Sequence, residues 1–374
     1  MKKDNPFVLN VYAGPEYFCN RKKETDTIKN AIRNKRNLTL ISHRRLGKSG
    51  LIKHVFNSLR NEKSLRLFYL DIMDTTDLNG FVELLAREII GKVDNKTMQL
   101  LKVFGNIVKS IRPKISVDPM TGTPEIEISI PNDVQPETSL SQIFSYLQKQ
   151  DKHVIIAIDE FQQITEYPEK NVEALLRKHI QQLSNTTFIF SGSQKHLLLS
   201  MFSDYGRPFY QSSEILNLGK IEKETYKLFI HEKFKNGKKD IDPVALELIM
   251  DYTKAHTFYV QYLCNKLYSL NLKVINQEAV TDTLLRLLDE NEVVYFNYKK
   301  LLTKLQFNLM EAVAKEEGVK KPTSKDFIWK YHLGTPSSVK TALTALLKKE
   351  MIFQDEDSIN VYDIFFSKWL ERRK

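Results

Sequence analysis

Residues 38–52 read LTLISHRRLGKSGLI. An apolar strand, Leu38 to Ile41, leads into a polar loop that ends in Gly47-Lys48-Ser49, and apolar residues follow at a helix start. This strand–loop–helix order is typical of a phosphate-binding loop (P-loop), whose backbone N–H groups surround phosphate oxygens. Ser42 stands where the pattern has its first glycine. The stretch therefore predicts a P-loop with one departure from the pattern.

The residue types of the loop indicate how it would bind a nucleotide. We expect Lys48 to neutralise the β and γ phosphates and the Ser49 hydroxyl to ligand Mg²⁺. Arg44 and Arg45 would either add positive field at the phosphates or contact a partner, and the sequence leaves both open. The predicted nucleotide-binding segment of the loop is Arg44, Arg45, Leu46, Gly47, Lys48, Ser49 and Gly50.

A second apolar strand, Val154 to Ile158, ends in two carboxylates, Asp159 and Glu160. Ligands of open α/β sheets bind at the carboxyl ends of the strands, where this acid pair would lie. We expect Asp159 to hold Mg²⁺, directly or through water, and Glu160 to orient and deprotonate the attacking water. The two motifs together predict an ATPase, and they favour hydrolysis over phosphoryl transfer to a small metabolite.

Short apolar runs alternate with amphipathic stretches as far as about residue 220, which predicts an α/β fold. We expect a P-loop NTPase parallel sheet of about five strands with helices on both faces. The expected strands are Leu38–Ile41, Arg66–Asp71, Val154–Ile158, Thr187–Phe190 and Ile215–Leu218. A hairpin signal at about residues 112–133 interrupts this order, either as a surface ornament or as a functional arm.

The remaining sequence changes character twice. Residues 221–298 are helical in pattern throughout and are expected to form a lid domain. Residues 299–374 read as helix, turn, helix and a two-stranded wing, which is the order of a winged helix-turn-helix. The predicted domains are thus a P-loop ATPase domain (1–220), a helical lid (221–298) and a winged helix (299–374), whose recognition helix would be Ser337–Glu350.

Composition excludes several classes of protein. With only Cys19 and Cys264, no disulfide framework or four-cysteine zinc site is available. No apolar run approaches the length that spans a bilayer, so we expect a cytoplasmic protein without a membrane partner. The formal net charge of +10 is compatible with nucleic-acid contact, but the lysines are spread along the chain.

The sequence resembles the P-loop ATPase family common in archaea and in some bacteria, which is related to the STAND and AAA+ classes. The resemblance extends from about residue 15 to the C terminus. Its segments are Phe18-Cys19-Asn20-Arg21, Ser42 to Ser49, Ile158-Asp159-Glu160-Phe161-Gln162, Phe190-Ser191-Gly192-Ser193-Gln194, Arg207-Pro208-Phe209-Tyr210 and Tyr362 to Leu370.

The resemblance implies further site residues. Ser193 and Gln194 would bond the γ-phosphate or the lytic water at a sensor-1 strand end, or would simply form a polar turn. Arg207 would stabilise transition-state charge, in cis or in trans, or hold its loop through an ion pair. The segment of Phe18 and Arg21 would lie against the adenine base, or would cap a helix start.

One departure from the family concerns the lid. The family usually has a Gly-x-Pro step near the nucleotide, whereas this chain reads Ala255-His256-Thr257-Phe258-Tyr259. The departure weakens any expectation that the lid senses nucleotide in the STAND manner. We therefore interpret His256 as a structural residue.

The function that these observations favour is Mg²⁺-dependent ATP binding and hydrolysis that drives a conformational switch of the lid and winged helix. The alternative is a nucleotide-gated DNA- or protein-binding module with little turnover, and a third hypothesis is a regulator that uses the winged helix alone. Expected ligands and partners are ATP or ADP with Mg²⁺, and either DNA at the winged helix, a protein partner or self-association.

Overall fold

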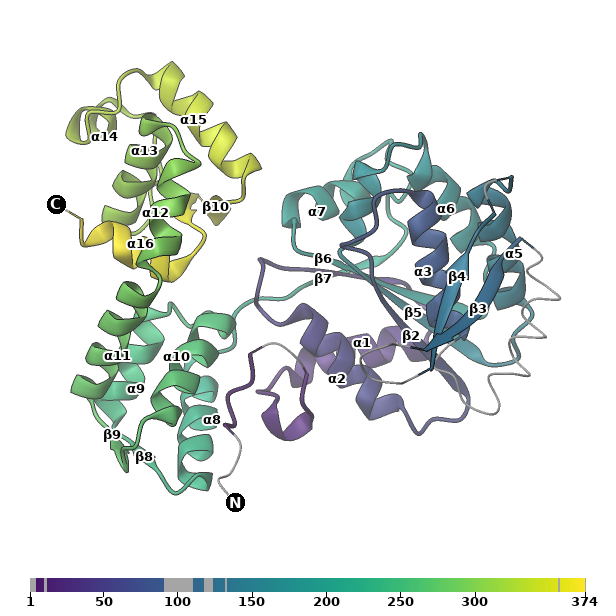
Figure 1. Cartoon of the computed structure of the whole chain (residues 1–374), viewed down its shortest axis with the longest axis horizontal. Coiled ribbons are helices and arrows are strands. Elements are labelled where there is room, and N and C mark those ends of the chain that lie inside the picture. Colours follow the sequence, from purple (N-terminus) through teal and green to yellow (C-terminus); the bar gives the residue numbers. More distant parts are fainter. Residues whose placement is uncertain are drawn as a thin grey trace. The chain divides into compact units, whose positions relative to one another are not determined.

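The computed structural model of the chain describes residues 5–9, 12–90, 110–117, 124–131, 133–355 and 357–373 (Figure 1). These residues divide into two compact units. The P-loop unit comprises residues 8–226 and 256–258, and the lid–wing unit comprises residues 5–7, 227–255 and the described residues from 259 onward.

A parallel sheet forms the centre of the P-loop unit, as predicted. Within the described residues it has five strands in the order β2-β5-β6-β1-β7. Because β6 lies between β1 and β5, the strand ends that carry the P-loop, the acid pair and Ser193 are neighbours. The strands are β1 (Leu38–Ile41), β2 (Leu65–Asp71), β5 (His153–Asp159), β6 (Thr186–Gly192) and β7 (Glu214–Asn217).

Helices cover both faces of this sheet. Alternate residues of β5 point to opposite faces, so Ile155 and Ala157 join one apolar cluster while Ile156 and Ile158 join another. The first cluster includes residues of α1 (Lys22–Arg33) and α2 (Lys48–Leu59). The second includes residues of α3 (Leu78–Ile90), α5 (Pro136–Gln148), α6 (Val172–Gln181) and α7 (Lys195–Ser203). Of two short 3-10 helices, η1 (Pro15–Tyr17) precedes α1 and η2 (Phe161–Glu166) lies between β5 and α6 in the chain.

A separate hairpin follows α3 in the chain. Its strands, β3 (Arg112–Val117) and β4 (Pro124–Ser129), pair antiparallel from Arg112 opposite Ser129 to Val117 opposite Pro124. The backbone N–H of Ile130 donates to Glu83 Oε1 of α3 at 3.1 Å, which ties the end of the hairpin to that helix.

The lid consists mainly of helices, with one addition to the predicted pattern. The two-residue strands β8 (Asp240–Ile241) and β9 (Val274–Ile275) pair in parallel, a ladder too short for sequence periodicity to reveal. An N-terminal residue completes this core, because the fully buried Phe7 ring lies 5.3 Å from Phe234 and 6.0 Å from Tyr268. The lid helices are α8 (Lys223–Asn236), α9 (Pro243–Tyr252), α10 (Thr257–Ser269) and α11 (Gln277–Glu290).

The C-terminal region has the predicted winged helix. Side chains of Thr303, Ser324 and Thr335 accept backbone hydrogen bonds at the N-termini of its first three helices after α12, which fixes where each begins. No helix among the described residues combines the length and apolar character needed to cross a membrane. The elements are α12 (Glu292–Lys300), α13 (Lys304–Lys315), α14 (Lys325–Lys330), α15 (Pro336–Lys348), β10 (Ile352–Asp355), β11 (Ser358–Val361) and α16 (Ile364–Glu371).

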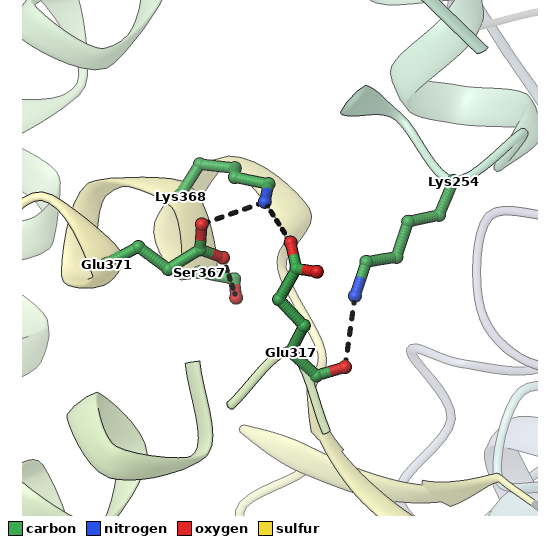
Figure 2. A network of polar contacts seen from close by, with 5 residues as sticks. All are labelled: Lys254, Glu317, Ser367, Lys368 and Glu371. Carbon is green, nitrogen blue, oxygen red and sulfur yellow. Dashed lines mark hydrogen bonds and ion pairs between the residues drawn. The ribbon is translucent and has the colours of Figure 1, made fainter. Parts of the chain in front are cut away.

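Helix α16 joins the lid helices and the winged helix within one unit. Its Phe365 ring lies 5.0 Å from Tyr259 of α10, and its Phe366 ring lies 5.2 Å from Tyr295 of α12. Figure 2 shows Lys368 of α16 between two carboxylates, Glu317 at 2.7 Å and Glu371 at 2.8 Å. The shared aromatic packing makes the lid and winged helix a single packed body, while both ion pairs lie within the winged helix.

Candidate functional site

The predicted P-loop joins β1 to α2 at the carboxyl edge of the sheet. Gly47 caps α2 with φ of 98°, a left-handed backbone conformation that residues other than glycine rarely adopt. A Cβ at Gly47 would meet no atom within 4 Å, so the backbone conformation, and not a lack of space, requires glycine. The turn starts α2 at the P-loop, and the first N–H groups of a helix, which have no partner within it, suit phosphate binding.

Lys48 is buried beneath this loop and held by it. Its Nζ donates to Ser42 Oγ at 3.2 Å and to the His43 carbonyl oxygen at 3.4 Å. Burial lowers the pKa of Lys48, and the nearby carboxylates of Glu160 and Asp159 oppose that shift. Ser42, which replaces the first glycine of the pattern, thus bonds the lysine of the same loop.

Asp159 connects the P-loop with two strands of the sheet. The Asp159 side chain is only 1% exposed, and its Oδ2 accepts from Ser49 Oγ at 2.5 Å and from the Tyr69 hydroxyl at 2.7 Å. Its Oδ1 accepts from Ser191 Oγ and from the Glu160 backbone N–H at 3.1 Å. The carboxylate therefore accepts hydrogen bonds from side chains of α2, β2 and β6 and from the backbone N–H of the next residue.

Ser49 and Asp159 form a donor set that fits Mg²⁺. Magnesium prefers hard oxygen ligands and is commonly held by one or two protein groups together with substrate phosphates and water. Within the described chain no group of three or more His, Cys, Asp or Glu residues could hold a metal ion by itself. The Ser49 hydroxyl and the Asp159 carboxylate suit a magnesium site that is completed by substrate phosphates and water.

Glu160 faces the end of β6. It has φ of 56°, and its Oε2 accepts from the Ser193 backbone N–H at 3.0 Å, from Ser193 Oγ at 2.8 Å and from Gln162 Nε2 at 2.6 Å. A Cβ at Gly192 would lie 1.9 Å from Gln162 Oε1, so the end of the Gln162 side chain occupies the space that the glycine leaves open. Glu160 is thus fixed in direction at the sheet edge.

The other predicted polar residues differ in where they lie. Ser193 bonds Glu160 and also accepts from Arg44 Nε at 3.3 Å, so the structure brings these three together. Gln194 is exposed at the start of α7. Arg207 instead pairs with Glu173 of α6 at 2.6 Å.

The segment before α1 contacts both the P-loop and α2. Arg21 is 5% exposed, and its Nη2 donates to the Leu46 carbonyl oxygen at 3.3 Å. The Phe18 ring stacks on His54 of α2 with ring centroids 4.1 Å apart. Tyr12 bonds the Nδ1 atom of the same histidine through its hydroxyl at 3.0 Å. Phe18 and Arg21 therefore border the loop from one side.

Residues 256–258, which belong to the P-loop unit, lie against the loop backbone. His256 Nε2 bonds the Arg44 carbonyl oxygen at 3.1 Å, and Thr257 Oγ1 donates to the Leu46 carbonyl oxygen at 3.3 Å. Burial lowers the pKa of His256 to about 4, so the ring is neutral at neutral pH. The Arg45 guanidinium lies 4.5 Å from the centroid of the Phe258 ring.

Sequence reasoning gave four residues of this site no role in it, although it interpreted His256 as structural. Tyr69 and Ser191 bond Asp159, and His256 and Thr257 bond the P-loop. Ser191 lies two residues before the predicted Ser193, within the same quoted segment, so alternation along β6 was the available signal. For Tyr69, the signal was its place two residues before the end of a strand that ends in Asp71.

Two family models match the chain. Residues 18–263 match the model described as "ATPase domain predominantly from Archaea", and residues 293–372 match a "probable winged helix domain". No curated protein sequence matches.

Solved structures resemble the whole chain at low identity. A Walker-type ATPase of Pyrococcus abyssi is 17% identical with a TM-score of 0.69, covering 98% of this chain and 99% of that chain. The ORC2 protein of Aeropyrum pernix, solved as ADPNP-ADP complexes, is 13% identical with a TM-score of 0.62, covering 99% and 96%. Cdc6p from Pyrobaculum aerophilum is 12% identical with a TM-score of 0.50, covering 98% of each chain. At such identities these likenesses concern the fold alone.

Proposed function

Because the chain belongs to the family of ATPase domains found predominantly in Archaea, as the sequence predicted, we propose that it hydrolyses ATP with Mg²⁺ and uses the nucleotide state to switch its lid and winged helix. The observation that carries this proposal is the bond between Ser49 of the P-loop and Asp159 of the acid pair, with Glu160 directed at Ser193 beside them. Bound Mg²⁺ would supply positive charge that offsets the negative charge developing on the phosphates.

The chain's own residues would act as follows. Lys48 would leave Ser42 and the His43 carbonyl oxygen to contact the β and γ phosphates, since a buried ammonium gains most from such a strong acceptor. Glu160 would accept a proton from the attacking water, and Ser193 would hold that carboxylate in direction.

Other proposed contacts follow from the site's borders. Arg44 would add charge near Ser193, and Phe18 and Arg21 would border the base side of the nucleotide. Gln194 would reach the γ-phosphate only by turning from solvent. Arg207 would have to release Glu173 before it could stabilise transition-state charge, in cis or in trans.

Two features support the switch. His256 and Thr257 bond carbonyl oxygens of the same loop whose N–H groups would bind phosphate, so a shift of the loop backbone would reach the first turn of α10. The ring contacts of α16 with Tyr259 and Tyr295 bind lid and winged helix into one body, so a movement of the lid would carry the winged helix with it.

Turnover of radiolabelled ATP by the full chain tests the proposal. We expect Mg²⁺-dependent release of phosphate by the parent protein and neither nucleotide binding nor turnover by Lys48→Ala. Lys63→Ala, an exposed lysine of the same unit, is the matched control and should behave like the parent. Tight nucleotide binding by the parent without turnover above the Lys48→Ala background would favour the nucleotide-gated binding module instead.

A second candidate function, nucleic-acid binding by the winged helix, rests on Trp329 of α14. Its side chain is 81% exposed, which is unusual for tryptophan and suits stacking on a base or sugar. Residues 318–350 contain seven lysines against two acidic residues, so the charge around this helix-turn-helix favours phosphate contact.

Fluorescence anisotropy with a labelled DNA duplex at increasing salt tests this candidate. We expect binding that weakens steeply with salt, and weaker binding by Trp329→Ala. Tyr205→Ala, which removes a 91% exposed aromatic ring from the P-loop unit, should leave it unchanged. No binding at low salt would remove the candidate in favour of a protein partner for the winged helix.

A further inference from the structure

Tyr69 lies on β2, next to the strand that carries the acid pair. In the sheet register Tyr69 is opposite Ala157, and Asp159 follows two residues later on the same face of β5. Asp159 is thus the diagonal neighbour of Tyr69 on that face of the parallel pair. The Tyr69 hydroxyl covers that diagonal and donates to Asp159 Oδ2 at 2.7 Å.

The ring of Tyr69 is held from the helix side. Lys53 of α2 places its Nζ 4.7 Å from the ring centroid. Lys53 follows Ser49 by one helical turn, so the helix that presents the Ser49 hydroxyl also covers Tyr69. The Tyr69 side chain is therefore held at two points, by Lys53 over its ring and by Asp159 at its hydroxyl.

Two hydroxyls share Asp159 Oδ2, and they would behave differently when a cation binds. Ser49 donates its proton to Oδ2, so the serine must turn that proton away before its oxygen can face a cation. Tyr69 donates along a separate direction from β2 and has no proposed role as a ligand. On the other oxygen, Ser191 Oγ and the Glu160 N–H hold Oδ1.

We propose that Tyr69 is a positioning residue for Mg²⁺ binding: its hydroxyl keeps Asp159 Oδ2 in the direction that receives the cation when Ser49 turns. Ser191 does the same for Oδ1. This inference rests on the proposed function, because it assumes that Mg²⁺ binds at Ser49 and Asp159.

Nucleotide binding, which needs no hydrolysis, tests the proposal. The affinity of the full chain for a fluorescent ADP analogue is measured in EDTA and at increasing Mg²⁺ concentration. Tyr69→Phe keeps the ring and its contact with Lys53 and removes only the hydroxyl. We expect its affinity in EDTA to stay within about twofold of the parent while the half-saturating Mg²⁺ concentration rises about tenfold, the size expected for one hydrogen bond to a charged group.

A matched control separates positioning from a general loss of structure. Tyr167→Phe removes a buried hydroxyl that bonds Thr75 Oγ1 at 2.5 Å elsewhere in the P-loop unit, and it should leave the Mg²⁺ response unchanged. Ser191→Ala should shift the Mg²⁺ response in the same direction as Tyr69→Phe. It also serves as the second variant if Tyr69→Phe does not fold.

The outcomes are distinguishable. An unchanged Mg²⁺ response in folded Tyr69→Phe overturns the positioning role, and so does a loss of affinity in EDTA as large as the loss in Mg²⁺. If only Tyr69→Phe fails to fold, an unchanged response in Ser191→Ala overturns the proposal. A parent protein whose nucleotide affinity ignores Mg²⁺ would refute the proposed Mg²⁺-dependent function itself, and the positioning role with it.

Discussion

Replacing Glu160 with glutamine separates nucleotide binding from hydrolysis more sharply than any other single change in the site. The parent carboxylate accepts three hydrogen bonds on Oε2, two from Ser193 and one from Gln162. Glutamine can present its carbonyl oxygen to the same three donors. The loss is therefore the negative charge and the ability to take a proton, and the local geometry should survive.

The sizes of the two effects follow from this arrangement. Hydrogen bonds to a carboxylate are roughly twice as strong as neutral ones, so weakening three of them should cost about 1–2 kcal/mol of unfolding free energy. Loss of a general base lowers a reaction rate by about 10² to 10⁴. We therefore expect Glu160→Gln to bind nucleotide with nearly the parent affinity and to hydrolyse ATP at least about a hundredfold more slowly.

Fluorescent nucleotide titration and phosphate release measure these effects on one preparation, with urea unfolding as the check on stability. As a control, Glu166→Gln removes an exposed carboxylate from η2, the short helix that begins after Glu160, and should keep parent activity. Turnover of Glu160→Gln within about threefold of the parent would refute the role of Glu160 as base. Equal losses of binding and turnover would refute the argument that the hydrogen bonds survive.

Three further predictions concern stability. Burial lowers the pKa of His256 from 6.5 to about 4, so the folded state resists protonation of this ring, and the free energy of unfolding should fall by at most about 3 kcal/mol as the pH drops from 6.5 to 4. In urea unfolding, His256→Gln should flatten the pH profile of stability over that window. An unchanged profile would contradict the burial argument. Phe365→Ala should destabilise the lid–wing unit by about 3–5 kcal/mol, because it removes a ring that packs on α10. Chemical unfolding followed by the fluorescence of Trp369 measures this loss. A loss below about 1 kcal/mol would show that α16 contributes little to the stability of the unit. Lys368→Met breaks the pairs with Glu317 and Glu371 and should lower the thermal midpoint of unfolding by a few degrees. The control Lys340→Met, on the exposed face of α15, should leave that midpoint unchanged. Equal midpoints for the two variants would contradict a stabilising role for these pairs.

Elements with a strong local signal could be predicted from the sequence. The central strands are continuous apolar runs, and their sheet was predicted because such runs need cover on both faces. In the winged helix, the Thr335 side chain caps the start of α15, and Pro336 has a fixed φ that suits the first helical position. Both effects act within one turn. Elements whose formation depends on neighbouring residues can therefore be predicted from the sequence.

Contacts that depend on the register between distant segments could not be predicted. Tyr69 meets Asp159 only because β2 and β5 pair with Tyr69 opposite Ala157, and nothing in either strand specifies that register. The sequence offered an ion pair among its readings of Arg207, but Glu173, 34 positions away, could not be named as its partner. His256 was interpreted as structural, and its bond to the Arg44 carbonyl oxygen depends on a contact across 212 positions.

The place of Phe7 has a consequence for how the protein is made. Its buried ring belongs to the lid core, with Phe234 and Tyr268, and its carbonyl oxygen accepts from Asn265 Nδ2 at 2.7 Å. A ribosome synthesises Phe7 before nearly all of the P-loop unit, and the helices that bury it come only after that unit. The nascent chain must therefore carry this phenyl ring without its partners while the P-loop unit is made, and the lid core is completed only when Phe234 and Tyr268 have been added.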